Sequence, residues 1–464
     1  MANPLTALLD PVAPTRDRAP QAYRLPDDWR RWAIPVGIGA ALVALSAVGL
    51  LFDAQRFFYA YLIGWAYCVS IALGALLFVM IQHVVKARWS TTLRRIPETL
   101  AAGFPLLALM GTPILFGLHD LFHWSHADIY HAAGAEFDRV LAGKAGYFFW
   151  PLEPGGFPLF WFGRLVAYFL LWSYLGRRLW KLSVGNDIAP DAANTIAARK
   201  TSAWGIPITG VAISFAAYDI LMSLDPHWFS TIFGVYFFAG GWWAALALIG
   251  FTAMLWRHGG LLHDEITTEH LQDIGKFMFG FTVFWTYIAF SQYMLYWYGN
   301  LPEEIRWYQT RFTNGWEYLS WALLIGHFVI PFLALLPRVT KRMLPFFAFM
   351  CVWALVMHWM DFAWLALPTL HVTPEGAEHG AALGQTLLDG ARVLPAALQE
   401  MAGHGEANVA AGHGAQASFS WLDFAAGLGL FLVWYGAAMW RAGRHAITPY
   451  NDPYFRESLR FENV

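Results

Sequence analysis

Ten long apolar runs constrain the fold of this 464-residue chain more than any other feature. An α-helix rises about 1.5 Å per residue and the hydrocarbon layer of a bilayer is about 30 Å thick, so about twenty apolar residues can cross it. Charged residues make up only 13% of the chain, against about 25% in soluble domains. We therefore predict an all-α polytopic membrane protein. Its spans are expected at about 32–52, 57–81, 97–118, 157–180, 204–224, 231–255, 277–298, 316–336, 345–367 and 421–440.

The distribution of lysine and arginine predicts the orientation of these spans. Ten crossings place both termini on one side, and the loops on that side carry most of the basic residues, as cytoplasmic loops do. The net charge of −2, with basic residues spread over many loops, argues against a nucleic-acid partner. The predicted regions are a cytoplasmic segment 1–31, nine spans within 32–367, a periplasmic loop 368–420 rich in Gly, Ala and His, a tenth span 421–440 and a cytoplasmic tail 441–464.

One stretch, Phe215 to Gly240, combines a membrane carboxylate with a very tight turn. Pro226 interrupts its apolar sequence and cannot continue a helix, so we predict two spans joined by a short outer turn. Asp219 then lies about 8 Å inside the apolar layer. A charged group at that depth is costly and indicates a functional site.

Further polar residues fall in the outer halves of other spans. His358 and Asp361 are three positions apart and share a helix face, so the carboxylate can orient the imidazole. Arg164 requires a carboxylate partner within hydrocarbon, either Asp219 or Asp361. Two interpretations remain open: a proton relay, or ion pairs and hydrogen bonds that only hold helices together. The full set is Arg164, Asp219, Tyr287, Ser291, Gln292, Glu317, His327, His358, Asp361 and Asp423.

The histidines leave two alternatives open. His327 and His358 lie at similar depth on neighbouring spans and could be the axial ligands of a b-type haem. His119, His123 and His126 are spaced by four and three, so they could share one helical face and bind a metal ion, or form an interfacial turn.

A matched spacing suggests an internal duplication. Asp219 precedes Pro226 by seven residues, and Asp361 precedes Pro368 by the same number, each at the outer end of a span. Spans two to five and six to nine are therefore predicted to form two related four-helix bundles, with the first and tenth spans flanking them.

Several of these segments together resemble a known family, the second large integral-membrane subunit of bacterial alternative complex III, a quinol:cytochrome c oxidoreductase. The likeness covers nearly the whole membrane region but not the loop 368–420. It implies the two-bundle fold of polysulfide-reductase and nitrite-reductase membrane subunits. The segments that carry it are HDLFHWSH (119–126), YDILMSLDPHWFSTIFGVYFFAG (218–240), FTVFWTYIAFSQYMLYWYGNLPEE (281–304) and HWMDFAWLALP (358–368).

The resemblance also implies a location and partners. It implies a bacterial inner-membrane protein that assembles with a paralogous quinol-oxidising membrane subunit, an iron–sulfur subunit, and multihaem and monohaem cytochromes c; a terminal oxidase is a further candidate. The chain itself is expected to ligate no haem, cluster or metal and not to be catalytic alone. A quinone or lipid contact is expected at most.

The resemblance also implies a proton-path role for particular residues of this chain. Arg164 is added to this set because it requires a carboxylate partner within hydrocarbon. The alternatives are a subunit with its own quinone-binding redox site, a structural scaffold, or a secondary transporter. A transporter would need helices broken at the midplane, whereas the Pro and Gly breaks are expected mostly at helix ends. The proton-path residues are Asp219, His227, Tyr287, Gln292, His327, His358 and Asp361.

Overall fold

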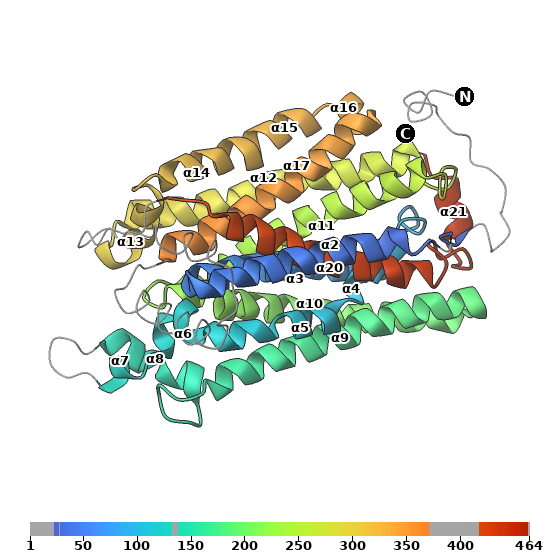
Figure 1. The fold of residues 1–464 in the computed structure, drawn as a ribbon. Helices are drawn as coiled ribbons and strands as arrows, with labels where there is room; N and C mark the ends of the chain where they lie inside the picture. Colours follow the sequence, from blue (N-terminus) through green and yellow to red (C-terminus); the bar gives the residue numbers. More distant parts are fainter. Residues whose placement is uncertain (1–22, 27, 132–137, 371–416, 463–464) are drawn as a thin grey trace, which may run out of the picture.

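The computed structural model describes residues 23–26, 28–131, 138–370 and 417–462. Within these residues, ten helical segments are long and apolar enough to span a membrane, and each overlaps one predicted run (Figure 1). The chain is thus an all-α polytopic membrane protein, as predicted. The ten segments are Arg30–Leu51, Ala54–Val84, Arg95–Leu121, Leu159–Ile188, Ala192–Leu224, Phe233–His258, Thr268–Gly299, Trp316–Leu335, Leu344–Thr369 and Trp421–Gly443.

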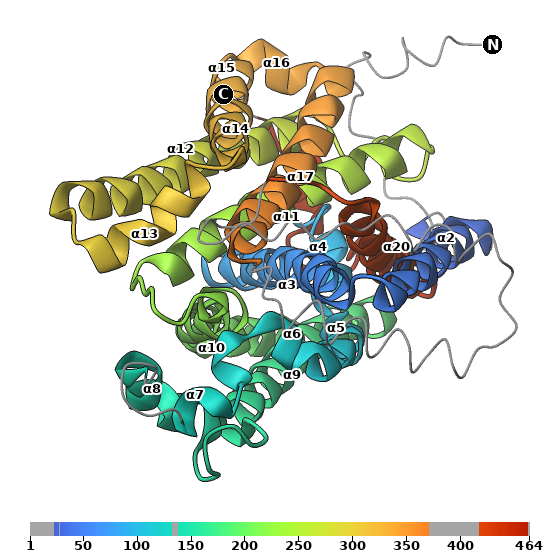
Figure 2. The same ribbon diagram turned by 60° about the vertical axis from the view of Figure 1, so that its left-hand side comes forward.

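Spans two to five form one bundle around α3, whose membrane window is completely buried. A helix that is apolar on every side is suited to this central position. The predicted grouping of the spans is therefore confirmed for the first bundle (Figure 2). Its helices are α3 (Ala54–Val84), α4 (Arg95–Ala101), α5 (Phe104–Met110), η3 (Thr112–Gly117), α6 (Leu118–Leu121), α9 (Leu159–Ile188) and α10 (Ala192–Ile220).

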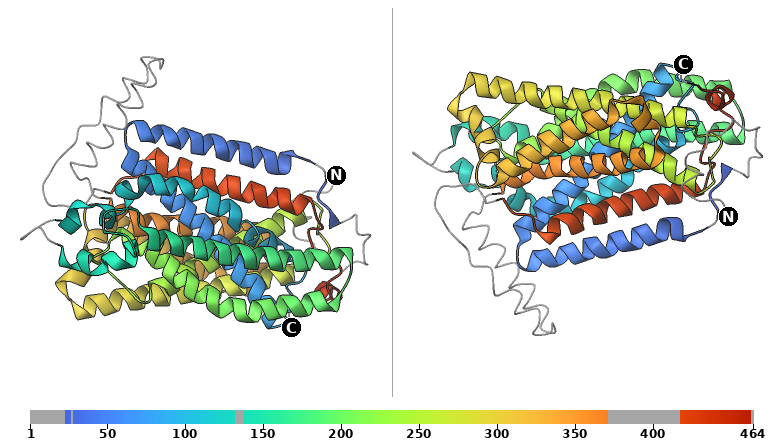
Figure 3. Two further views of the ribbon diagram at one scale, coloured as in Figure 1. Left: turned by 90° about the horizontal axis from the view of Figure 1, so that it is seen from below. Right: turned by 90° about the horizontal axis from the view of Figure 1, so that it is seen from above.

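Spans six to nine form the second bundle, which packs against the first through α11 on α3. The two flanking spans are neighbours: α2 (Arg30–Ala47) packs on α20 (Trp421–Gly443), and α20 packs on α3 (Figure 3). The second bundle contains α11 (Phe233–His258), α12 (Thr268–Gly299), α14 (Trp316–Leu323), η7 (Leu324–Val329), α15 (Ile330–Leu335) and α17 (Leu344–Ala366).

Shorter helices end some of the spans, lie between others, or follow the last span. Helices α8 and α13 lie at the end of the molecule opposite the C-terminus, where the turn after α10 also lies (Figure 1). The short elements are η2 (Val48–Leu51), η4 (His123–Ser125), α7 (Asp128–His131), α8 (Arg139–Phe149), η6 (Met222–Leu224), α13 (Pro302–Arg311), α16 (Arg338–Arg342), η8 (Leu367–Thr369) and α21 (Phe455–Leu459).

Glycines bring α3 and α11 into unusually close contact. A Cβ atom on Gly74 would lie 2.5 Å from the carbonyl oxygen of Gly241, and one on Gly241 would lie 2.7 Å from the carbonyl oxygen of Ser70. Real Cβ atoms do not approach other atoms so closely, so the crossing requires small residues, as membrane helix interfaces often do. The close crossing positions Ser70 beside the second bundle.

Two spans are irregular in ways that the sequence did not predict. The third span is interrupted after Ala101 and again after Met110, close to Pro105 and Pro113, because proline cannot donate the backbone hydrogen bond of a continuous helix. Its breaks therefore lie inside the span, and the expectation of breaks mainly at helix ends is wrong here. The eighth span contains a π-helical turn, Leu324–Val329, a feature often found at functional sites.

The described ends of the chain meet at one end of the molecule. Arg24 forms an antiparallel backbone bridge with Ala446, and the amide of Ile447 donates to the carbonyl oxygen of Tyr23 at 2.8 Å. Most of the predicted N-terminal segment, and residues 371–416 of the predicted loop 368–420, lie outside the described residues.

Candidate functional site

Three ionisable side chains converge in the core of the second bundle. His327 from η7 and His358 and Asp361 from α17 are all at most 1% exposed. One potential ligand atom from each lies within 4.8 Å of the others, and no other such group of three occurs within the described residues. The structure thus brings together three of the residues that the sequence singled out.

The hydrogen bonds of His358 determine which of its nitrogens carries the proton. Ser70 donates its only hydroxyl hydrogen to the carbonyl oxygen of Tyr67 at 2.8 Å, so the bond of 2.9 Å between Ser70 Oγ and His358 Nε2 must be donated by the histidine. Nδ1 is then the basic nitrogen, and it has no hydrogen-bond partner. A Cβ atom on Gly240 would lie 3.0 Å from Nδ1, so only glycine leaves room beside it.

Asp361 faces the same small region. One carboxylate oxygen accepts a short hydrogen bond from the hydroxyl of Tyr236 on α11. The other oxygen, Oδ2, lies 3.6 Å from the position of a Cβ on Gly240, on the side where His358 Nδ1 lies. Tyr236 therefore fixes one oxygen of the carboxylate, and the Trp285 side chain is a second polar neighbour of Asp361.

His327 has no hydrogen-bond partner at either ring nitrogen. Its ring lies between the indoles of Trp243 and Trp285, with centroid distances of 4.1 and 3.7 Å. Buried polar atoms without partners are rare and destabilising, and a bridging water needs two or more such atoms around it. The unpaired nitrogens of His327 and His358 and the second oxygen of Asp361 provide such a setting.

This arrangement is compatible with more than one chemistry. Two imidazoles and a carboxylate could pass a proton through one intervening water, and by ligand type they could also share a metal ion. A haem held by His327 and His358 would have to displace the indoles stacked on His327.

Arg164 and Asp219 form a separate ion pair in the first bundle. Arg164 Nε and Nη2 donate to the two oxygens of Asp219 at 2.9 and 2.6 Å, and the Tyr168 hydroxyl donates to the same carboxylate at 2.9 Å. Arg164 also donates to the carbonyl oxygen of Tyr147 at 2.6 Å. Of the two expected carboxylates, Asp219 is thus the partner of Arg164, and both of its oxygens are already bonded.

The remaining predicted site residues lie elsewhere. His227 is at the surface, where Nε2 lies 2.5 Å from a carboxylate oxygen of Asp138. Partial burial raises the pKa of Asp138, but bonds from two backbone amides and the proximity of His227 outweigh this and lower its pKa overall. Gln292 is buried, accepting from Ser230 Oγ and donating to the Tyr308 hydroxyl, each at 3.0 Å. Tyr287 is 64% exposed on α12 and contributes to neither cluster.

The three-histidine segment does not form a single helical face, which was one of the two alternatives. The helix ends at Leu121, and His123 begins a separate short turn that ends at Ser125. His119 and His126 rings pack at 5.2 Å, whereas His123 faces His227 at 6.1 Å. Of the two alternatives, the shared helical face is therefore wrong, because the chain leaves the helix between the first and second histidines.

Arg311, which the sequence analysis did not single out, is fully buried at the C-terminal end of α17. Its guanidinium donates to the carbonyl oxygens of Trp364, Leu365 and Trp307 at 3.1, 2.7 and 2.8 Å. Burial lowers its pKa to about 9, so it is charged at neutral pH. The residue lies between two apolar runs, where an arginine normally indicates an exposed loop, so the sequence held no signal of its burial.

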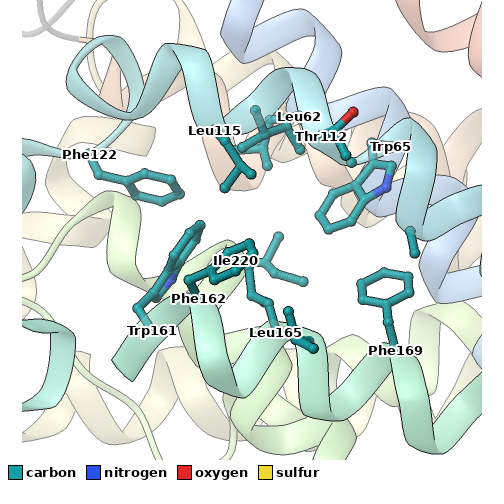
Figure 4. Close-up of a pocket in the computed structure, with 14 residues that line it drawn as sticks. Leu62, Trp65, Thr112, Leu115, Phe122, Trp161, Phe162, Leu165, Phe169 and Ile220 are labelled. Carbon is teal, nitrogen blue, oxygen red and sulfur yellow. The ribbon is translucent and has the colours of Figure 1, made fainter. Parts of the chain in front are cut away.

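An apolar cavity of about 100 Å³ lies in the first bundle beside the broken third span (Figure 4). The polar groups on its walls are already used: Trp65 Nε1 donates to Leu107, Trp161 Nε1 to Asp219, and Thr112 Oγ1 to Leu109, each at a backbone carbonyl oxygen. The cavity therefore suits a hydrocarbon chain better than a quinone headgroup, which needs hydrogen-bond partners. Its walls include Leu62, Leu115, Leu165, Phe169 and Ile220.

No family model matches the sequence. Comparison with curated proteins likewise gives no match.

Proposed function

We propose that this chain is a membrane subunit of a bacterial respiratory quinol:cytochrome c oxidoreductase of the alternative complex III type. Support comes from the segments 218–240, 281–304 and 358–368 together with a ten-span, two-bundle fold. In this proposal the chain sits in the inner membrane with both termini in the cytoplasm. It works beside a quinol-oxidising paralogue, an iron–sulfur subunit and cytochromes c, and contributes no catalytic redox centre itself.

Within that complex, the proposed role is proton conduction through His327, His358 and Asp361. The observation that carries this proposal is the set of unpaired, fully buried nitrogens beside a carboxylate. Intramembrane groups of this kind are typical of proton relays. A purely structural cluster would be expected to satisfy its donors and acceptors, as Arg164 and Asp219 do.

The hydrogen bonds of His358 and Asp361 support a proton-exchanging role for one particular atom of each residue. His358 Nε2 keeps its proton for Ser70, so Nδ1 is the nitrogen that takes up and releases a proton. Asp361 exchanges that proton through its oxygen that is not bonded to Tyr236, by way of a water in the space between them. His327 offers the next acceptor. His227 and Asp138 would receive protons at the outer surface.

The two membrane carboxylates should respond differently to neutralisation. Asp361→Asn removes the proton-exchanging group, so the complex should assemble at normal yield but lose turnover and proton movement, with Asp361→Glu milder. Asp219→Asn instead leaves the half-buried Arg164 without its partner and should lower the yield. The measurements are complex yield, quinol:cytochrome c activity, and the response of a pH-sensitive dye in proteoliposomes.

Glu457→Gln, at an exposed ion pair with Arg88, is the matched control. Full yield, full activity and an unchanged proton signal in Asp361→Asn would end the relay proposal. Reduced yield with normal activity per assembled complex would make the cluster structural.

A further inference from the structure

A second cavity, of about 200 Å³, lies at the end of the molecule where the two described chain ends meet. It is formed by the end of α9, the segment around Arg24, and the stretch that follows α20. Its polar walls are Arg24, Asp187, His445 and Tyr450, and its apolar walls are Val184 and Ile188. The cavity is independent of the His327 cluster and of the proposed respiratory role.

Positive charge around this cavity exceeds negative charge. Arg95, which is 1% exposed, donates from Nη2 to Asp187 at 2.6 Å, while its Nη1 makes no hydrogen bond. The pKa of His445 is lowered by burial and then by the charges of Arg95, Arg24 and Arg444. Asp187 is the only carboxylate on the cavity wall.

The charge of Asp187 is offset in part by Arg95, which donates to Oδ2, whereas Oδ1 has no hydrogen-bond partner. The backbone carbonyl oxygen of Asp187 accepts from the Tyr450 hydroxyl at 2.9 Å and from Asn451 at 3.2 Å. The local excess of positive charge therefore comes from Arg24 and Arg444.

The cavity lies at the depth of lipid headgroups. It is at the ends of two membrane spans, Leu159–Ile188 and Trp421–Gly443. Aromatic rings typical of the membrane interface surround it: Trp180 packs on His445 at 4.9 Å, and Trp440 lies under the guanidinium of Arg444 at 3.7 Å. Ile188 is 82% exposed and gives the cavity an apolar edge.

We propose that this cavity binds the phosphate group of an anionic phospholipid, with Arg24 and His445 on the phosphate and the acyl chains leaving past Ile188. Basic pockets between spans on the side richer in lysine and arginine are suited to such headgroups. Free inorganic phosphate shares the recognised chemistry, but it would not use the apolar edge. The experiment therefore needs an arm for each.

The test uses the purified full-length chain in detergent micelles. Phosphatidylglycerol is titrated against a phosphatidylcholine background, and the rise in thermal midpoint gives an apparent affinity. Removing one arginine near the headgroup should weaken binding about fivefold, so Arg24→Gln should shift the titration by about that factor. The matched control is Arg31→Gln, an exposed basic residue of the same end that lies outside the cavity.

Ile188→Glu provides a variant that does not depend on a buried group, because the side chain is largely exposed. It should weaken phosphatidylglycerol binding through charge repulsion at the apolar edge while leaving the midpoint in phosphatidylcholine unchanged. Equal affinities in wild type, Arg24→Gln and Ile188→Glu would overturn the proposal. Stabilisation by inorganic phosphate without any by phosphatidylglycerol would overturn the lipid assignment.

Discussion

His358 donates its Nε2 hydrogen to the Oγ of Ser70 across the interface between the two helix bundles, at 2.9 Å. Ser70 is on α3 and His358 is on α17, so the first bundle holds the tautomer of a histidine that belongs to the second. The close glycine crossing of α3 and α11 makes this contact possible. Ser70 is thus a positioning residue for the proposed relay.

Ser70→Ala should leave the complex assembled but change the pH dependence of its proton movement. The variant frees Nε2 and lets the ring adopt either tautomer, at a cost of about 1–3 kcal/mol for the unpaired donor. The measurement is the pH profile of the dye response in proteoliposomes. Ser202→Ala is the control, since Ser202 is also buried and only donates to Ala198 one turn earlier. Identical profiles for both variants would refute the positioning role.

His327→Phe separates stacking from proton transfer. Phenylalanine can keep the packing between Trp243 and Trp285 but removes two buried nitrogens that have no partner. Thermal stability should therefore be equal or higher, because an unpaired polar group is lost from the core. Proton movement should fall sharply. Normal proton movement in this variant would remove His327 from the relay.

Arg164 and Asp219 should behave as a coupled structural pair. Arg164→Gln or Asp219→Asn alone should each destabilise the chain by about 3–5 kcal/mol, because one buried charge loses its partner. The double variant should be destabilised by less than the sum. Thermal midpoints followed by tryptophan fluorescence give the comparison. The exposed pair Arg88 and Glu457 is the control, with about 1 kcal/mol or less expected. Additive effects at the buried pair would contradict the coupling.

The orientation of the spans can be tested by labelling intact cells with an impermeant maleimide. Cysteine at Ser418, an exposed residue before α20, should be labelled, whereas cysteine at Ala189, an exposed residue after α9, should not. The native residues Cys68 and Cys351 are buried and should give little background. Labelling only at residue 189 would reverse the proposed orientation.

The pH dependence of stability should report on the cavity near His445. Burial and the charges of Arg95, Arg24 and Arg444 lower the pKa of His445 in the folded state below its ordinary value of 6.5. As the pH falls below 6.5, His445 is therefore protonated in the unfolded chain before it is protonated in the folded one. Stability therefore falls as pH drops from 6.5 toward the folded-state pKa. A bound phosphate should raise that pKa and reduce the fall. The fall in stability is measured as the change in thermal midpoint below pH 6.5, in phosphatidylcholine with and without phosphatidylglycerol. His445→Gln should remove the difference, and an equal difference in this variant would contradict the assignment.

The sequence predicted the spans well because crossing a bilayer requires a long apolar run, which is visible without knowledge of the fold. It also predicted His358 and Asp361 as neighbours, since their spacing is a property of one helix. Ser70 and Tyr236 were missed because their contacts depend on how separate helices pack. Tyr287 was wrongly grouped with the buried polar residues, because the sequence of an apolar span does not show which of its faces meets lipid. In the structure this side chain is exposed.

The pairing of α2 with α20 restricts the order in which the protein can be completed in the membrane. Within the described residues, the extensive helix contacts of α2 are with α20, and α2 makes few or none with α3, which follows it in sequence. During synthesis, the first span therefore enters the bilayer before α20 has been made. It lacks its main packing partner until residues 421–443 have been inserted. The buried ion pair between Arg56 and Asp423 then joins the start of α3 to the start of α20. Truncation before the last span should leave the first one unanchored and open to proteolysis by membrane quality control.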